Sequence, residues 1–160
     1  MITNEILKTI EQIAREVFGK LETKAQISVA QARLPDGQVD DATVSVSVTM
    51  DDPQLYIGEK GQTLFEIQHV IRAMARKKLG QAPWIALDIN EYQKTKEAYL
   101  AELANAAADE AALLKKEKEL PAMTARERRI IHTVISQRTD VTSESAGEEP
   151  DRKVVIRPKP

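Results

Sequence analysis

Apolar residues recur at three- and four-residue steps at the start of the chain, and this spacing predicts an amphipathic helix over residues 1–21. Its apolar side consists of Ile6, Leu7, Ile10, Ile13, Ala14, Val17, Phe18 and Leu21. Thr3 or Asn4 can cap the first turn with a side-chain oxygen. Gly19 is a candidate for a left-handed stop near the end of this helix, because glycine adopts positive φ without steric cost.

A strict alternation of apolar and polar residues over positions 43–50 predicts a strand that rests one face on a core. Another strand is predicted before it, over residues 27–34, and the Pro-Asp-Gly sequence at 35–37 is a turn signal between the two. Residues 84–89 predict a third strand.

Helical patterns occupy two longer segments of the chain. Residues 62–79 predict a helix with Val70 among its apolar residues, and Gly80 ends it. Residues 92–119 are rich in Ala, Glu and Lys and contain neither Gly nor Pro, which predicts a long helix of about 40 Å. Its apolar stripe is thin and includes Leu114, so we expect this helix to be only partly packed.

The C-terminal part of the chain predicts a small helical and stranded unit. Thr124 can cap a helix over residues 125–137, whose apolar residues Ile130, Ile131, Val134 and Ile135 face inward. Short strands are expected over 141–143 and 153–156, with a loop over 144–152 between them. The fold class is therefore α+β, and residues 1–90 predict a three-stranded sheet with helices on one face.

Composition narrows the class of protein. The chain has 160 residues, 42% of them hydrophobic and 30% charged, which is enough apolar material for one domain or two small ones. The absence of cysteine excludes disulfides and thiolate metal sites. The sequence has no apolar run of about 18 residues and no cleavable apolar leader, so we expect a cytoplasmic protein.

Charge is distributed unevenly along the chain. The net charge of -2 hides two zones, residues 58–90 and 120–160, that each carry two more basic than acidic residues. Nucleic-acid binding depends on local potential, so this pattern is compatible with a nucleic-acid partner. It argues against a polycationic, nonspecific binder.

The sequence Gly58-Glu59-Lys60-Gly61 stands immediately before the predicted helix that begins at Gln62. Glycines let a backbone approach a phosphate closely, the helix start offers free N–H groups, and Lys60 adds a positive charge. A plain turn is the commoner use of such a Gly-x-x-Gly pattern. The strand, loop, helix and strand around it favour the alternative, a KH-type loop that clamps single-stranded nucleic acid.

A second cluster lies in the predicted helix over residues 125–137. Arg128 and His132 are four residues apart and share one helical face, with Arg129 beside them. A guanidinium and an imidazole can together hold a phosphate and stack on a base. The alternative, which the spacing alone favours, is a solvated helix face whose histidine caps a carbonyl.

No pattern in the sequence indicates catalysis. The loop at residues 58–61 is not a Walker motif, because Gln62 stands where that motif needs lysine. His69 and His132 fall in different predicted units without clustered partners, so neither a metal site nor a catalytic triad is indicated. We expect no cofactor and no enzymatic activity.

The ordered set of motifs resembles a known family. Residues 55–64 (LYIGEKGQTL) look like the core of a bacterial type II KH domain. Residues 120–123 (LPAM), 127–132 (ERRIIH) and 147–156 (GEEPDRKVVI) look like an R-3-H domain, named for Arg-x-x-x-His. This order is similar to that of the Jag family, also called KhpB, EloR or SpoIIIJ-associated proteins. The resemblance covers nearly the whole chain, and we expect the N-terminal Jag domain of many members to be missing.

The resemblance implies an organisation and a set of contacts. Residues 1–91 would form the type II KH domain, residues 92–119 a long connecting helix, and residues 120–160 the R-3-H domain. The residues it implies in RNA binding are Gly58, Glu59, Lys60, Gly61, Gln62, Arg128, Arg129 and His132. Glu59 is acidic where basic or polar residues are common, and should weaken phosphate affinity.

The function implied is that of a bacterial, cytoplasmic protein that binds single-stranded RNA or single-stranded DNA. It would act as a post-transcriptional regulator or RNA chaperone linked to cell elongation and shape. The alternative is a protein-interaction adaptor that pairs with a small stand-alone KH protein or with itself, with RNA binding secondary. A membrane partner is not expected.

Overall fold

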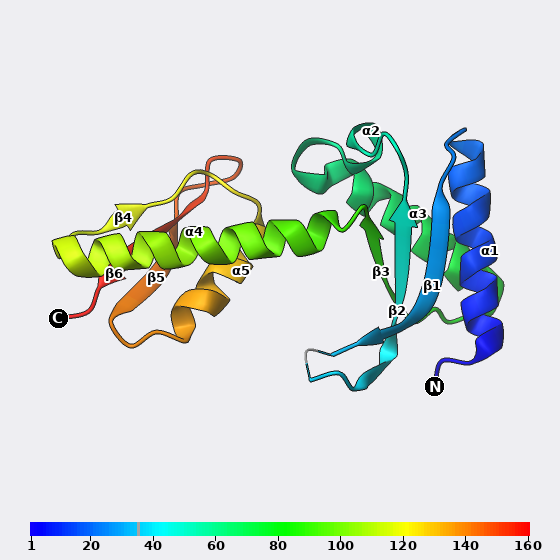
Figure 1. The fold of residues 1–160 in the computed structure, drawn as a ribbon, viewed down its shortest axis with the longest axis horizontal. Coiled ribbons are helices and arrows are strands. Elements are labelled where there is room, and N and C mark those ends of the chain that lie inside the picture. The colour runs from blue at the N-terminus through cyan, green and yellow to red at the C-terminus, as the bar shows by residue number, and fades with distance from the viewer. Residues whose placement is uncertain (35) are drawn as a thin grey trace. The chain divides into compact units, whose positions relative to one another are not determined.

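A computed structural model describes residues 1–34 and 36–160, which divide into two compact units, Met1–Gln93 and Lys94–Pro160. Pro35, the first residue of the predicted turn, lies outside the described residues. Both units combine helices with a small three-stranded sheet (Figure 1). No helix in the described part of the chain is long and apolar enough to cross a membrane.

The first unit builds one sheet from its three strands, in the order β1-β2-β3. Strands β1 and β2 pair antiparallel, whereas β2 and β3 pair parallel. The elements follow the predicted sequence of helix, two strands, helices and strand. They are α1 (Asn4–Lys20), β1 (Gln26–Arg33), β2 (Val39–Thr49), α2 (Gln54–Ile57), η1 (Glu59–Gly61), α3 (Gln62–Leu79) and β3 (Trp84–Ile89).

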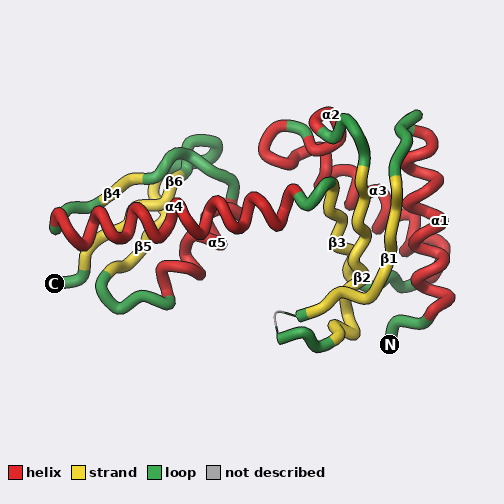
Figure 2. The backbone as a smooth tube through the Cα atoms, viewed as in Figure 1, coloured by secondary structure: helices red, strands yellow, loops and turns green. Residues whose placement is uncertain are grey.

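Helices α1 and α3 cover one face of this sheet (Figure 2). The core between them is aliphatic, with Phe18 as its one fully buried aromatic side chain among the described residues. Alternation along the second half of β2 places Val44, Val46 and Val48 in this core, whereas the serines and threonines between them lie on the other face. The core consists of Ile10, Ile13, Ala14, Phe18, Val44, Val46, Val48, Met50, Leu64, Ile67, Ile71, Ala75, Ile85, Leu87 and Ile89.

Two sequence predictions within this unit are wrong. Gly19 does not end helix α1 in a left-handed conformation, because the helix continues to Lys20 and Glu22 takes the positive φ of 56°. Val70 does not face the core but is 50% exposed, because Ile67 and Ile71 already occupy the buried side of α3. The cap of α1 follows the prediction, since the Thr3 hydroxyl accepts from the Ile6 N–H at 3.3 Å.

The second unit packs α4 and α5 with a sheet in the order β4-β6-β5, all pairs antiparallel. Its elements are α4 (Tyr92–Leu114), β4 (Lys118–Glu119), α5 (Ala125–Ser136), β5 (Val141–Ala146) and β6 (Lys153–Pro158). Small side chains form the buried stripe of α4, as the thin apolar pattern predicts. The buried residues of that stripe are Leu100, Ala104, Ala107, Ala108 and Ala111.

The long helix is shorter than predicted. It ends at Leu114, which is 56% exposed rather than packed, and Lys115 follows with a φ of 54°. Lys118 and Glu119 lie within the helix predicted over residues 92–119, but they instead pair with Ile156 and Val155 of β6. A ladder with a strand distant in sequence overrides the helical propensity of this segment.

The loop predicted over 144–152 is also too long. Strand β5 extends to Ala146, so residues 144–146 belong to the hairpin ladder with β6. Helix α5 follows its prediction: Thr124 and Glu127 form a reciprocal capping box, with the Thr124 N–H donating to Glu127 Oε2 at 2.8 Å. Lys96 on α4 lies 3.2 Å from the other Glu127 oxygen, Oε1, and this ion pair joins the start of α5 to α4.

Candidate nucleic-acid interface

Residues Gly58 to Gly61 form a tight loop between α2 and α3, and three of the four have positive φ. The values are 73° at Gly58, 52° at Lys60 and 80° at Gly61. This run of left-handed residues turns the chain sharply into helix α3. It leaves Glu59 and Lys60 exposed at the tip of the loop, whereas Gly61 is buried.

Both glycines are required by their surroundings. A Cβ atom at Gly58 would lie 2.2 Å from the Thr63 hydroxyl oxygen, closer than any real contact allows. A Cβ atom at Gly61 would lie 3.0 Å from Cε1 of Tyr92, whose ring lies beside it. The loop is therefore held in one shape by a close approach to Thr63 and by contact with the Tyr92 ring.

The start of helix α3 lacks a side-chain cap. Gly61 occupies the N-cap position, and no side chain accepts from the first N–H groups of the helix. The side chain of Gln62 points along the helix, where its Nε2 donates to Glu66 Oε1 at 3.1 Å. The main-chain N–H of Gln62 donates to the Glu59 carbonyl. The N–H groups of the residues that follow, with the positive end of the helix dipole, stand near Lys60 in an arrangement that suits an anion.

The second predicted cluster lies on α5, where Arg128 is almost entirely buried. Its side chain is 9% exposed, and both terminal nitrogens have partners. Nη1 donates to the Met123 carbonyl at 2.7 Å, and Nη2 donates to Glu149 Oε1 at 2.6 Å. Glu149 lies in the turn between β5 and β6, so Arg128 fixes that turn against the start of α5.

His132 is half-buried and bonds to two serine hydroxyls of β5. Nδ1 lies 2.7 Å from Ser143 Oγ, and Nε2 lies 2.8 Å from Ser145 Oγ. Burial lowers the pKa of His132 below its ordinary value of 6.5, and the nearby positive charge of Arg128 lowers it further. The ring is therefore neutral at pH 7, and it does not cap a carbonyl as the simpler sequence interpretation proposed.

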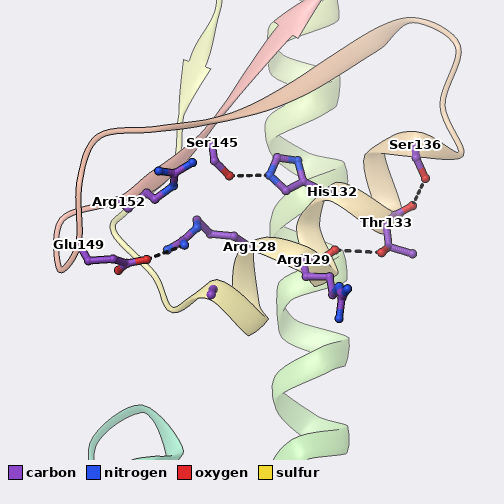
Figure 3. A pocket seen from close by; sticks show the side chains of 9 residues that line it. Arg128, Arg129, His132, Thr133, Ser136, Ser145, Glu149 and Arg152 are labelled. Carbon is purple, nitrogen blue, oxygen red and sulfur yellow. Dashed lines mark hydrogen bonds and ion pairs between the residues drawn. The ribbon is translucent and has the colours of Figure 1, made fainter.

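These residues border a hollow of about 570 Å³ on the surface of the second unit (Figure 3). Arg129 and Arg152 lie at the same hollow, together with Arg128 and His132. Arg129 is exposed and Arg152 is half-buried. The lining residues are Ala125, Arg128, Arg129, His132, Thr133, Ser136, Ser145, Glu149 and Arg152.

The structure gathers the predicted residues at two places. The first five, Gly58 to Gln62, meet at the α2–α3 loop, and Arg128, Arg129 and His132 meet at the hollow. Sequence reasoning missed Ser143, Ser145, Glu149 and Arg152. The two serines had a usable signal, because residues two apart on a strand share a face, but the predicted strand stopped at 143.

No metal centre competes with this assignment. Within residues 1–34 and 36–160, no three His, Asp or Glu side chains gather in a way that could hold an ion. His69 is exposed on α3, as a surface histidine would be. The two sites thus present main-chain N–H groups and cationic side chains, which are the groups that bind phosphates.

Comparison with known proteins places the chain in a family. The R-3-H domain family model matches residues 98–158. The chain is 30% identical to the RNA-binding protein KhpB of Bacillus subtilis, covering 96% of this chain and 76% of that protein. It is also 30% identical to KhpB of Clostridium symbiosum, over 93% of this chain and 64% of that relative.

A more distant relative is KhpB of Streptococcus pneumoniae, at 26% identity over 92% of this chain and 44% of that protein. The chain therefore spans less than two thirds of the length of several relatives that it matches. Neither the R-3-H domain nor KhpB is a family of enzymes, in agreement with the sequence prediction. The likeness to the Bacillus subtilis protein extends through both units, so this chain belongs to the KhpB family and carries its R-3-H domain.

Proposed function

We propose that this protein binds single-stranded RNA at two sites, the loop Gly58–Gly61 and the hollow beside α5. We assign residues 1–91 to a type II KH domain, residues 92–119 to the connecting segment and residues 120–160 to the R-3-H domain. The relatives named RNA-binding protein support the choice of RNA as ligand. The residues that line each site favour a single-stranded ligand, because the phosphates and the bases of a single strand are both accessible to protein side chains and main chain.

The observation that carries the proposal is the shape of the loop. Gly58 leaves half-exposed main chain without a side chain, and the exposed Lys60 stands between it and the buried Gly61, at a helix start without a side-chain cap. A phosphodiester can then accept from main-chain N–H groups and lie next to the Lys60 ammonium without a Cβ atom in the way.

Glu59 sets the strength of this site. Its carboxylate is exposed next to Lys60, so it opposes the attraction between the loop and a phosphate. We therefore propose that the loop alone binds weakly and that useful affinity comes from one strand engaging both sites. Two linked contacts raise the overall affinity through effective concentration.

The test of the loop must separate binding from folding. Replacing Gly58 would disturb folding and binding together, because any Cβ atom there collides with Thr63. Lys60→Asn is the sharper variant, since asparagine tolerates the positive φ of this position and removes the charge. Lys77→Gln, on the exposed side of α3, removes the same charge in the same unit.

We expect Lys60→Asn to weaken binding of a short single-stranded RNA by roughly three- to tenfold, measured by fluorescence anisotropy across a salt series. The slope of log affinity against log salt should fall by about 0.7, the value for one lost phosphate contact on a single strand. Equal losses for Lys60→Asn and Lys77→Gln would contradict the proposal. Single-stranded DNA and duplex RNA of the same sequence, measured in parallel, define the nucleic acid preferred.

An adaptor role is a second candidate, favoured by exposed apolar residues at the end of α4. Leu113 is 82% exposed and Leu114 is 56% exposed, although both lie in a unit with its own core. A partner with an apolar helix, such as a stand-alone KH protein or a second copy, could cover them. A partner that stays bound after RNase treatment but is lost with Leu113→Gln supports this role. Loss of the partner with RNase alone supports RNA as the primary ligand.

The cellular role that the resemblance implies is also part of the proposal. Binding to unpaired RNA would serve post-transcriptional control linked to cell elongation and shape. Deletion of the gene should then change cell length, and cells in which the chromosomal copy carries Lys60→Asn should show the same change. Normal length in those cells, with RNA binding lost in the purified variant, would separate cell shape from RNA binding.

A further inference from the structure

We infer that Arg129 and Arg152 contact the RNA phosphates at the hollow, while Arg128 and His132 hold it in shape. This inference rests on the proposed function, because it names which side chains of that site meet the ligand. It changes the roles within the Arg-x-x-x-His pair. It also adds Arg152, which lies in the matched segment 147–156 but is not among the residues predicted to bind RNA.

Arg128 is poorly placed to bind a phosphate. Its Nη1 and Nη2 atoms already donate to the Met123 carbonyl and the Glu149 carboxylate, at 2.7 and 2.6 Å. The guanidinium charge is matched by the carboxylate charge, and the side chain is 9% exposed. A phosphate at these atoms would have to displace Glu149 and release the turn between β5 and β6.

His132 is likewise committed to the protein. Both ring nitrogens are engaged by the Ser143 and Ser145 hydroxyls, and its lowered pKa keeps the ring uncharged at pH 7. A neutral ring with both nitrogens bonded offers a phosphate neither charge nor a free donor. Its contacts instead hold β5 against α5, which positions the floor of the hollow.

Arg129 and Arg152 have the opposite character. Across the described residues, the Arg129 guanidinium makes no hydrogen bond or ion pair, and the side chain is exposed. Arg152 donates from Nη1 to the Gly147 carbonyl at 3.4 Å, a long and weak bond. Both side chains border the hollow, Arg129 from α5 and Arg152 from the approach to β6 (Figure 3).

Two cations at the rim of one hollow match the chemistry of a nucleic-acid backbone. Each phosphodiester carries one negative charge, and a guanidinium can donate two parallel hydrogen bonds to it. Because Arg129 and Arg152 break no strong internal contact on binding, their whole charge is available to the ligand. Arg128 would have to exchange one anion for another, which yields little net gain.

The experiment compares charge-removing variants in the full chain, using anisotropy of a fluorescent single-stranded RNA over a salt series. Arg129→Gln and Arg152→Gln should each weaken binding roughly three- to tenfold and lower the salt slope by about 0.7. Their melting temperatures should match that of the unmodified protein. Matched controls are Arg126→Gln, which lies on α5 and pairs with Glu97, and Arg157→Gln, on β6 and paired with Glu117.

Arg128→Lys tests the positioning role directly. Lysine keeps the positive charge but cannot reach both the Met123 carbonyl and Glu149 with the geometry of a guanidinium. We expect a lower melting temperature and a salt slope equal to that of the unmodified protein. A slope lowered by Arg128→Gln but restored by Arg128→Lys, at equal stability, would make Arg128 a phosphate contact and overturn the inference.

The outcomes separate this inference from the proposed function. If the unmodified protein binds RNA but Arg129→Gln and Arg152→Gln behave like the two controls, the assignment of contacts is wrong and RNA binding stands. If the unmodified protein ignores single-stranded RNA even in dilute buffer, the proposed function fails and this inference fails with it. Nuclear magnetic resonance can also measure solvent exchange of the arginine side chains without RNA. If the Arg128 guanidinium is no more protected from exchange than that of Arg129, the inference is overturned.

Discussion

The two candidate RNA sites differ in the part of the chain that supplies their chemistry. At the loop Gly58–Gly61 the main chain is the binding surface, and its shape depends on the absence of side chains at the glycines. At the hollow beside α5 the side chains are the surface, and the Arg-x-x-x-His pair, Arg128 and His132, is bonded inside the protein. Binding at the loop therefore depends on the main-chain conformation. Binding at the hollow depends on which arginine side chains have no strong partner within the protein.

This difference determines what a substitution reports. A change at a loop glycine alters the fold and the binding surface together, so it cannot isolate binding. A change at the hollow can separate the two, because Arg128 has structural partners whereas Arg129 lies open to solvent. The stability of each unit is thus the first property to measure.

The largest effect is expected at the loop. Gly58→Ala forces a Cβ atom to within 2.2 Å of the Thr63 hydroxyl at a φ of 73°, and should lower the free energy of unfolding by about 2–3 kcal/mol. Gly19→Ala is the matched control, because Gly19 lies inside α1 with no atom within 4 Å of the added methyl. That variant should gain about 0.5–1 kcal/mol, since alanine is the better helix former. Urea denaturation followed by circular dichroism measures both, and equal effects would contradict the strained geometry of the loop.

The next effect is expected at the hollow. Arg128→Ala removes two hydrogen bonds and leaves the Met123 carbonyl without its partner, which should cost about 2 kcal/mol of stability. Arg129→Ala, one residue along the same helix, should change stability by less than about 0.5 kcal/mol. Thermal unfolding of the two variants side by side provides the comparison. A greater loss for Arg129→Ala would reverse the roles assigned to the two arginines.

A smaller effect is expected at the start of α5. Thr124→Ala removes the hydroxyl that accepts from the Glu127 N–H at 3.3 Å, and should cost about 1 kcal/mol. Thr133→Ala is a suitable control, because its hydroxyl bonds back to the Arg129 carbonyl within the helix. The difference between the melting temperatures of the two variants measures how much the Thr124 cap contributes to stability. No difference would mean that the capping box contributes nothing to this unit.

The smallest effect concerns pH. The pKa of His132 is lowered in the folded protein, so between that pKa and about 6.5 the unfolded chain binds more protons than the folded one. Stability should therefore fall as the pH drops below 6.5, and be fully present above it. His132→Gln should show a flatter dependence between pH 7 and pH 5 in the same denaturation experiment. A profile as steep as that of the unmodified protein would place the acid sensitivity elsewhere.

Sequence patterns were sufficient where the contacts are local. Thr124 was predicted as the cap of α5 and is, and Glu127, three residues later, completes a capping box that the prediction did not include. The glycines that frame Lys60 were likewise evident from the sequence. The partners of the hollow are distant instead: Glu149 reaches Arg128 from the turn between β5 and β6. A motif five residues long contains no information about that turn.

Strand β4 illustrates the same limit. Lys118 and Glu119 have helical propensity, and only their neighbours on β6 make them a strand. The burial of Arg128 could not be predicted for a related reason, since an arginine on an amphipathic helix is usually solvated. Knowing which cations are occupied required the structure, and this knowledge moved the expected phosphate contacts to Arg129 and Arg152.

The most direct test of RNA binding observes the main-chain amides themselves. Titration of the ¹⁵N-labelled chain with a short unstructured RNA should shift the amide signals of residues 58–63 and of the residues that border the hollow. Shifts at both places with one saturation curve would establish that a single strand engages both. Signals that remain unchanged there, or that move only around Leu113 and Leu114, would contradict the account.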